Sequence, residues 1–307
     1  MLSATQHAAV TSDAARPLQI LAGPGSGKTR VLTSRVAWLV RDSATPIAPE
    51  RCVVVTFTTR AANEMRARLE SMIGADRTRR LVLGTFHAVC VRFLRRWGTR
   101  LGLDPRFTIA DADDARRLLR DVERDADAAL SAISRAKAHG WTPDELRASG
   151  THAPGSPGHA EHLALCRTYA AYQQQLRASH ALDFDDLLLL GVRLFREHPE
   201  LTAHIDHVLV DEFQDTNAVQ YELLCRLSPH VSVVGDPDQS IYSWRHADMR
   251  HIERMHLDFP GLHRVLLEEN FRSTPQILDA ALRVMQQDPL RIPKGLYTAL
   301  ASVCLLY

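Results

Sequence analysis

The stretch that decides the fold is Ile20-Leu21-Ala22-Gly23-Pro24-Gly25-Ser26-Gly27-Lys28-Thr29, where an apolar run meets a glycine-rich loop and then a helical pattern. Glycines let successive backbone N–H groups turn inward around an anion, and the first turn of the helix adds partial positive charge. Lys28 would reach the β- and γ-phosphates of a nucleotide, and the Thr29 hydroxyl would bind Mg²⁺. The pattern therefore predicts a nucleotide-binding loop, with an accidental Lys-Thr after a glycine-rich turn as the alternative.

The scarcity of lysine argues against that accident. Among 37 basic residues the only lysines are Lys28, Lys137 and Lys294, and the others are arginines. A lysine that falls by chance at the end of such a loop is improbable in this chain. Ala22, which stands where the strict pattern has glycine, is a small-residue variant.

A second apolar run, His207-Val208-Leu209-Val210-Asp211-Glu212, ends in two adjacent acids. A phosphate-binding loop needs a carboxylate on a neighbouring strand, and Asp211 would hold Mg²⁺ there through its water shell. Glu212 would orient and deprotonate an attacking water. Taken alone, the pair could be a solvated helix cap, but together with the loop it favours hydrolysis.

The apolar runs predict a parallel sheet covered on both faces, which is the α/β class. The expected strands are Pro17–Ala22, Cys52–Thr58, Leu81–Thr85, His207–Phe213, Val231–Gly235 and His263–Leu267. From about Ala88 to His204 the pattern is helical with no clear strand, so we expect an inserted helical domain. The expected helices are Thr29–Val40, Thr59–Ile73, Ala112–Val122, Asp125–Ala138, His162–Arg177 and Phe184–Glu197. We expect a loop at Ser149–His159 and no periodicity in Gln286–Tyr307.

Composition sets outer limits on function. The 307 residues are enough for about two domains, and 45% hydrophobic with 24% charged residues is an ordinary globular mix. A net charge of +1 argues against a protein that coats polyanions along their length. Five scattered cysteines predict a reducing compartment without disulfides or a zinc site. No signal peptide or bilayer-spanning run is visible, so we expect the bacterial cytoplasm or the eukaryotic nucleus and no membrane partner.

The glycine-rich loop is the first of seven motifs that occur in a fixed order, and Gln6 precedes them all. They are Ala22–Arg30, Val55–Thr58 with Ala61–Met65, Gly84–His87, Leu182–Leu187, Asp211–Thr216, Val234–Arg245 and Glu269–Thr274. From about Leu2 to Thr298 the chain resembles the N-terminal half of a superfamily 1 DNA helicase of the UvrD/Rep/PcrA type.

The resemblance implies a P-loop RecA-like parallel-sheet domain interrupted by an all-helical insertion domain. The implied boundaries are 1–87 and 205–272 for the RecA-like domain, 88–204 for the insertion, and 273–307 for a truncated start of a second motor domain with an atypical tail. The implied activity is ATP-dependent 3′-to-5′ translocation on single-stranded DNA and unwinding. ATP and Mg²⁺ would be the cofactors, and single-stranded and partly duplex DNA the partners.

The resemblance also assigns roles to residues. The implied catalytic set is Lys28, Asp211, Glu212, Gln239 and Arg272, of which Gln239 would sense the γ-phosphate and Arg272 would be an arginine finger. The implied nucleotide contacts are Gln6, Ala22, Gly23, Pro24, Gly25, Ser26, Gly27, Lys28, Thr29, Arg30 and Phe271. The implied metal ligands are Thr29 and Asp211. The implied DNA contacts are Phe57, His87, Tyr242, Trp244 and Arg245, of which Tyr242 and Trp244 are also hard to bury together.

Two other clusters have plainer interpretations. Phe93 and Trp97 are four residues apart, so a helix would bury them on one face and leave the nearby arginines in solvent; phosphate contact is the alternative. These arginines are Arg92, Arg95, Arg96 and Arg100. Asp183, Asp185 and Asp186 could suggest a metal cluster, but at a helix start we expect them to cap it.

The sequence departs from the family at three places. Thr59-Arg60 replaces the usual Asn-Lys, and Phe271 replaces a tyrosine. The chain also stops soon after Glu269–Thr274, so we expect weak nucleotide and DNA binding, little hydrolysis and no unwinding from it alone. The alternatives are an ATP- and DNA-binding fragment without turnover and the helicase subunit of a helicase–nuclease; a P-loop kinase or GTPase is remote.

Overall fold

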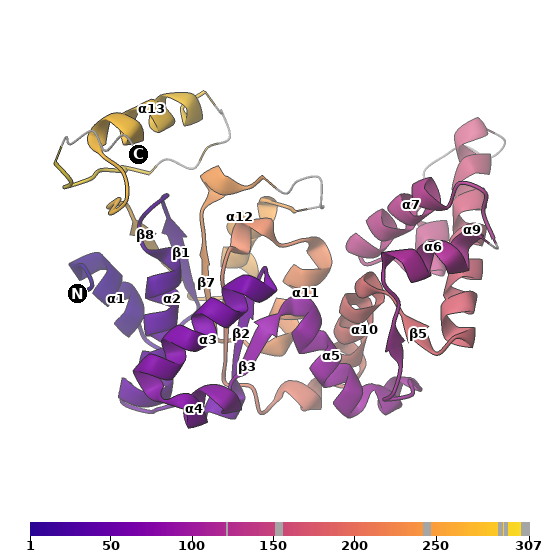
Figure 1. The fold of residues 1–307 in the computed structure, drawn as a ribbon, viewed down its shortest axis with the longest axis horizontal. Coiled ribbons are helices and arrows are strands. Elements are labelled where there is room, and N and C mark those ends of the chain that lie inside the picture. Colours follow the sequence, from indigo (N-terminus) through magenta and orange to yellow (C-terminus); the bar gives the residue numbers. More distant parts are fainter. Residues whose placement is uncertain (121, 151–155, 242–246, 288–290, 292–293, 302–307) are drawn as a thin grey trace. The chain divides into compact units, whose positions relative to one another are not determined.

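The computed structural model describes residues 1–120, 122–150, 156–241, 247–287, 291 and 294–301. The chain folds into two compact units (Figure 1). Unit 1 comprises Met1–Phe86, Leu201–Thr216 and Leu227–Tyr307, and unit 2 comprises His87–Glu200 and Asn217–Arg226. Each unit is therefore assembled from stretches that are far apart in the sequence.

Unit 1 is built on a six-stranded sheet with the order β3-β2-β6-β7-β1-β8, in which every neighbouring pair is parallel. The strands are β1 (Leu18–Ala22), β2 (Cys52–Thr56), β3 (Val82–Thr85), β6 (His207–Val210), β7 (Val231–Gly235) and β8 (His263–Leu267). Because all strands run the same way, the loops that follow them emerge at one edge of the sheet, where ligands bind in such folds.

Helices cover both faces of this sheet. On one face lie α1 (Ala4–Thr11), α2 (Lys28–Ala37) and α3 (Thr59–Ile73), and α12 (Arg250–Asp258) lies on the other. Unit 1 also contains α4 (Ala75–Arg80), which packs against α3, and α13 (Pro275–Met285), which follows β8. A capping box between Ser3 and Gln6 starts α1, and the Thr58 side chain caps α3 by accepting from the Ala61 N–H. On the α12 face, Gln19 of β1 donates to the Ile252 carbonyl at 2.7 Å. Short 3-10 turns at Phe213–Asp215 (η5) and Pro237–Gln239 (η6) follow β6 and β7.

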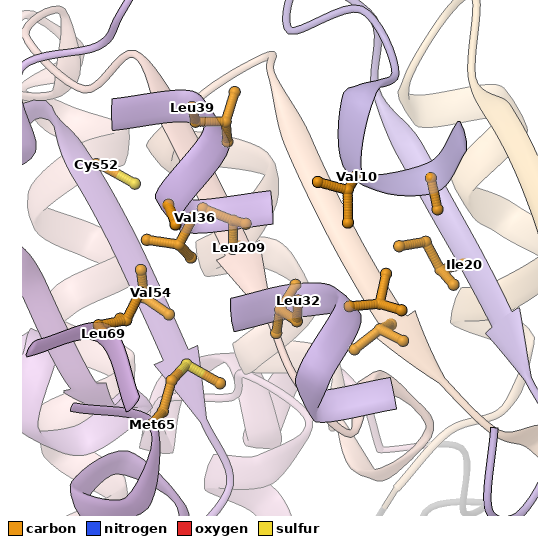
Figure 2. Packing of buried hydrophobic residues seen from close by; sticks show 14 of the residues in the cluster. Val10, Ile20, Leu32, Val36, Leu39, Cys52, Val54, Met65, Leu69 and Leu209 are labelled. Carbon is orange, nitrogen blue, oxygen red and sulfur yellow. The ribbon is translucent and has the colours of Figure 1, made fainter. Parts of the chain in front are cut away.

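The core of unit 1 lies between the sheet and the helices α1, α2 and α3. Figure 2 shows Leu32 and Val36 of α2 pointing toward Val54 and Leu209 of the strands. These side chains are fully buried, and Met65 of α3 packs beside them. Each contributes about 1.5–3 kcal/mol through its removal from water. The packing holds α2 rigidly, and with it the loop at its start.

A buried polar network fixes the last part of α2. The Arg35 guanidinium, at 0% exposure, donates to the Val10 carbonyl at 2.9 Å and to Ser232 Oγ at 3.3 Å. Ser232 Oγ also lies 2.8 Å from Nε2 of His207. Burial, helped by the charge of Arg35, lowers the pKa of His207 to about 3. The imidazole is therefore neutral in the folded protein at all ordinary pH values.

Unit 2 is helical. Its helices are α5 (Phe86–Trp97), α6 (Ala112–Arg120), α7 (Ala126–Ala138), α8 (Pro143–Ala148), α9 (Pro157–Ala178), α10 (Phe184–Glu197) and α11 (Ala218–Leu227). Its core centres on Tyr169 and Tyr172 of α9 with Ile133 of α7. A short parallel pair, β4 (Thr108–Ile109) and β5 (Ala181–Leu182), joins two of the connections.

A buried ion cluster ties α7 to α10 inside unit 2. The Lys137 ammonium, at 0% exposure, lies 2.6 Å from Asp183 Oδ2 and 2.7 Å from Asp186 Oδ1. Tyr172 donates to Asp183 at 3.0 Å, and Gln173 donates to Asp186 at 2.8 Å. Asp183 is the N-cap of α10 and forms a capping box with Asp186, so the capping prediction is confirmed for these two acids, while Asp185 lies in the first turn of the helix.

The fold class predicted from the sequence is confirmed, and each expected strand overlaps an observed one. Two local expectations were wrong, and a helix with a visible start signal was not predicted. The stretch 88–204 contains β4 and β5, which are too short to show a period. The expected loop Ser149–His159 ends early, because Ser156 caps α9 and Pro157 opens it. The helix α8 was also missed, although Thr142 and Glu145 form a capping box at its start.

The buried imidazole of His207 predicts an acid-dependent loss of stability. Its folded pKa is about 3, against an ordinary value of 6.5, so the unfolded chain binds a proton that the folded chain does not. The stabilisation that comes from burying the neutral imidazole is complete above pH 6.5. As the pH falls toward 3 it is lost, and the free energy of unfolding decreases by up to about 1.4 kcal/mol per pH unit. Urea unfolding between pH 7.5 and 4 should give a shallower pH dependence for His207→Gln than for wild type.

The control is His7→Gln, which changes an exposed histidine on α1. Its pH dependence should follow that of wild type. Parallel curves for His207→Gln and wild type would show that the imidazole of His207 is not held neutral by the fold.

Candidate functional site

The loop Gly23–Gly27 joins β1 to α2 at the carboxyl edge of the sheet. Gly25 and Gly27 have φ values of +68° and +81°, which place both in the left-handed region that glycine tolerates. Ser26 Oγ donates to the Gly23 carbonyl at 2.7 Å, and Gln6 Nε2 donates to the Ser26 carbonyl at 2.8 Å. Gly27 caps α2 without a side-chain hydrogen bond, so no side chain cap covers the first turn of α2. The loop and the start of α2 together have the backbone geometry of an anion-binding site.

The Lys28 ammonium lies at the centre of this edge. Its Nζ is 3.5 Å from Glu212 Oε2 and 3.9 Å from Asp236 Oδ2. It is buried, and among the described residues it has no hydrogen-bond partner. A buried polar group without a partner is rare and costs about 1–3 kcal/mol, more when it is charged. The arrangement indicates an acceptor that the described residues do not supply.

Two carboxylates follow β6. Asp211, at 4% exposure, accepts a long hydrogen bond from the Thr29 hydroxyl at 3.5 Å. Burial, with the neighbouring Glu212 charge, raises the pKa of Asp211 to about 6. Glu212 itself has a φ of +50°, an unfavourable conformation for a residue with a side chain. The strained backbone directs its carboxylate, which accepts from Gln214 Nε2 at 2.9 Å.

The loops after β6 and β7 are joined through Gln214. Its Oε1 accepts from the Asp236 backbone N–H at 2.9 Å, while its Nε2 serves Glu212. On η6, Gln239 Nε2 donates to Asp236 Oδ2 at 2.5 Å. The Glu212 carboxylate is therefore linked through Gln214 to the backbone of the loop after β7. Sequence reasoning gave no role to Gln214 or Asp236, because nothing in the motifs reveals which backbone group they contact.

The loop after β8 closes on the glycine-rich loop. Asn270 Nδ2 donates to the Pro24 carbonyl at 2.7 Å, and the Phe271 N–H donates to the Gly25 carbonyl at 2.9 Å. Asn270 Oδ1 also accepts the Arg272 N–H at 2.8 Å. These bonds place exposed Arg272 and the 46% exposed ring of Phe271 beside Gly25. Asn270 is a second residue whose positioning role the sequence did not reveal.

The residues predicted to contact DNA fall into three groups. Phe57 is half-buried between β2 and α3 of unit 1. His87 belongs to unit 2, where burial lowers its pKa and its ring meets Phe184 edge-on at 5.8 Å. Phe184 is 52% exposed at the first turn of α10 and was not singled out, although an aromatic residue between aspartates at a helix start is a visible signal. Tyr242, Trp244 and Arg245 lie outside the described residues.

The arginine-rich face of α5 follows its plainer interpretation. Phe93 is buried and stacks on Trp97 with ring centroids 5.5 Å apart. Arg95 donates to the Pro105 carbonyl at 2.8 Å, and Arg100 pairs with Glu200. These two arginines therefore have partners within unit 2.

Residues 2–260 match the model of a family described as UvrD-helicase, UvrD/REP helicase N-terminal domain. The chain belongs to this family. It is 42% identical over 298 residues to the ATP-dependent DNA helicase PcrA of Leuconostoc citreum, and 39% identical over 299 residues to proteins of that description from Staphylococcus aureus and Staphylococcus epidermidis. These matches cover 92% of this chain but only 39–40% of each relative, so the chain spans about two fifths of their length.

Membership of the UvrD-helicase family confirms the resemblance drawn from the ordered motifs. It does not test the individual site residues. The structure brings together Lys28, Thr29, Asp211 and Glu212 around the glycine-rich loop, with Asp236 beside them. The nucleotide, metal and DNA roles of the predicted residues stay predictions. Within the described ranges, no helix combines the length and apolar character that a bilayer crossing requires.

The geometry of Gly27 yields a stability prediction. A Cβ at this position would lie 2.9 Å from Gln6 Nε2, the group that holds the Ser26 carbonyl. Gly27→Ala should therefore lower the free energy of unfolding by about 1–2 kcal/mol for the left-handed backbone, and by about 1 kcal/mol more for the disturbed hydrogen bond. Urea unfolding measures the difference.

Gly261→Ala is the matched control in the same unit. Gly261 has a φ of +76°, and nothing lies within 4 Å of its added Cβ. The free energy of unfolding of Gly261→Ala should fall only by the amount due to the left-handed backbone. Equal losses in the two variants would show that Gln6 does not brace the loop.

Proposed function

We propose that this chain binds ATP at the Gly23–Gly27 loop and single-stranded DNA, as the N-terminal part of an ATP-dependent DNA helicase that moves 3′ to 5′. The observation that carries the proposal is the buried Lys28 ammonium, which has no hydrogen-bond partner among the described residues. A phosphate oxygen between the loop and Lys28 would supply that acceptor and balance the charge. Family membership and the PcrA relatives support the same activity.

The phosphate contacts follow from the loop geometry. The backbone N–H groups of the loop and the first turn of α2 would hold the β-phosphate, and Lys28 would bridge the β- and γ-phosphates. Thr29 Oγ1 and Asp211 Oδ2, which are 3.5 Å apart, are oxygen ligands of the kind that Mg²⁺ prefers. When bound there, Mg²⁺ would neutralise charge on the phosphate oxygens.

Glu212 is suited to activate the water. In hydrolysis, the water oxygen forms a bond to the γ-phosphorus, the bond to the bridging oxygen breaks, and the water proton passes to the Glu212 carboxylate. Gln214 holds one Glu212 oxygen at 2.9 Å, so the carboxylate keeps a defined direction. Gln239 would respond to the γ-phosphate through Asp236, and Arg272 would stabilise the charge that develops during transfer.

Contact between Gln6 and the adenine base would require a change in the hydrogen bonds that Gln6 makes in this structure. Gln6 would read the adenine edge, yet its Nε2 already donates to Ser26 and its Oε1 accepts the Ser3 N–H at 3.0 Å. Reading the base therefore requires Gln6 to exchange one of these bonds. Phe271 needs no such change, because its exposed ring is free to stack on adenine.

Aromatic and cationic side chains would form the DNA track. Phe57, His87, Tyr242, Trp244 and Arg245 would contact the strand, and exposed Phe184 beside His87 adds aromatic surface. Stacking of a base on such a ring contributes about 1–3 kcal/mol and tolerates any sequence. This suits a protein that moves along arbitrary DNA.

The extent of the chain limits what we propose for it alone. The relatives are more than twice as long as this chain. We therefore propose that the 307-residue chain binds nucleotide and DNA, hydrolyses ATP slowly and does not unwind duplex DNA. A manyfold stimulation of steady-state hydrolysis by single-stranded DNA would contradict the slow-turnover part of this proposal.

Two variants separate phosphate binding from hydrolysis. Lys28→Met should weaken ATP binding at least tenfold, because the ammonium that faces the phosphates is lost. Glu212→Gln should bind ATP within about threefold of wild type but lower single-turnover hydrolysis by about 10²-fold or more. Calorimetry measures binding, and quenched-flow measures hydrolysis.

The control is Arg60→Met, which removes a cation at 89% exposure that pairs with Glu64 on the surface of α3. Its binding and hydrolysis should equal those of wild type. Unchanged ATP affinity in Lys28→Met, with the fold intact, would refute the nucleotide site.

The raised pKa of Asp211 predicts a pH dependence. Because this carboxyl has a pKa of about 6 in the folded chain, it is ionised at pH 7.5 and protonated at pH 5. The gain in ADP affinity on adding Mg²⁺ should therefore fall about tenfold per pH unit below 6.

Asp215→Asn is the control, since Asp215 also has a pKa raised to about 6 by burial and accepts a hydrogen bond from Gln214. In Asp215→Asn, the increase in ADP affinity caused by Mg²⁺ should still fall below about pH 6. In Asp211→Asn, Mg²⁺ should give no increase in ADP affinity at any pH. The same Mg²⁺ gain at pH 5 and pH 8 in wild type would exclude Asp211 as a ligand.

A further inference from the structure

The described part of the C-terminal segment, Arg291 and Lys294–Ala301, supplies two cations to the loop after β7. The Lys294 ammonium pairs with Asp236 Oδ1 and lies 3.1 Å from Asp238 Oδ2. The Arg291 guanidinium lies 3.1 Å from the same oxygen of Asp238. The Lys294 and Asp236 side chains are both at 0% exposure. Two buried carboxylates are thus neutralised by residues more than fifty positions later in the chain.

Asp236 stands between two lysines. Its Oδ1 pairs with Lys294, while its Oδ2 accepts from Gln239 and lies 3.9 Å from Lys28 Nζ. A buried carboxylate needs a full positive charge close by, and removal of one partner leaves the other uncompensated. Arg291 is engaged with Asp238, so Lys28 is the other cation placed to compensate Asp236.

The backbone holds Lys294 in place independently of this ion pair. The Tyr297 N–H donates to the Glu268 carbonyl at 3.0 Å, and the Asn270 N–H donates to the Tyr297 carbonyl at 2.7 Å. The Gly295 N–H donates to Glu268 Oε1 at 2.6 Å, and Leu296 packs against Gly23. A substitution of the Lys294 side chain therefore leaves the segment attached to the loop after β8.

We propose that Lys294 is a positioning residue for the phosphate site: it neutralises Asp236, so that Lys28 stays available to phosphate. Without Lys294, the Lys28 ammonium closes on Asp236 and withdraws from the loop. The inference rests on the proposed function, since it concerns the same phosphate site. It makes phosphate affinity depend on a residue that is itself directed away from the phosphates, toward Asp236 and Asp238.

The test compares binding of ADP and inorganic pyrophosphate by calorimetry in four forms of the full chain. Lys294→Met should lose at least tenfold in affinity for both ligands. Lys294→Met with Asp236→Asn should recover to within about threefold of wild type, because Lys28 no longer faces an uncompensated carboxylate. Arg283→Met, which removes a 77% exposed cation of α13, should equal wild type.

The three lysines of the chain allow a readout without any ligand. In protein labelled with ¹⁵N at lysine Nζ, Lys294→Met should shift the Lys28 signal, and the added Asp236→Asn should return it toward the wild-type position. Wild-type affinity in Lys294→Met, or a loss that Asp236→Asn does not rescue, would overturn the proposal. If wild type binds neither ligand, the proposed function fails, and an unmoved Lys28 signal in Lys294→Met would separately refute the role of Lys294.

Discussion

The buried ammonium of Lys28 is the constraint on which the rest of the site depends. It can lie at the carboxyl edge of the sheet because packing of α2 against the strands fixes its backbone, and because Glu212 and Asp236 offset its charge. Within the described part of the chain the ammonium has no hydrogen-bond partner, so its charge is balanced while its donors stay unused. An anion that enters the glycine-rich loop meets a site already organised for it, which lowers the cost of binding.

The same chemistry recurs at every lysine of the chain. Lys137 faces Asp183 and Asp186, Lys294 faces Asp236 and Asp238, and Lys28 faces Glu212 and Asp236. Elsewhere the basic residues are arginines. A compact ammonium fits between two carboxylates inside a protein, where the planar fork of arginine is better suited to one carboxylate at a time. Asp236 is shared by two of these lysines, so one buried carboxylate lies between the glycine-rich loop and the C-terminal segment.

Sequence patterns predicted those strands and site residues whose positions follow from one simple physical rule. Strands such as Cys52–Thr56 are continuous apolar runs because both faces of a parallel sheet are covered. Asp211 and Glu212 follow such a run directly, and Lys28 follows one after the loop Gly23–Gly27. The residues that join the loops could not be predicted. Gln214 contacts Asp236 22 residues later, Asn270 reaches Pro24 across 246 residues, and Lys294 reaches Asp236 across 58. Their partners are set by the order of strands in the sheet, which no local pattern encodes.

The most direct measurement of the central claim is a backbone amide NMR titration of the 307-residue chain with ADP. If the loop and the first turn of α2 bind the phosphates, the amides of Gly25, Gly27 and Lys28 should show the largest shifts and saturate together, and adenosine should leave them in place. If ADP binds while these amides stay unmoved and other regions shift, the phosphate site lies elsewhere and the account is wrong.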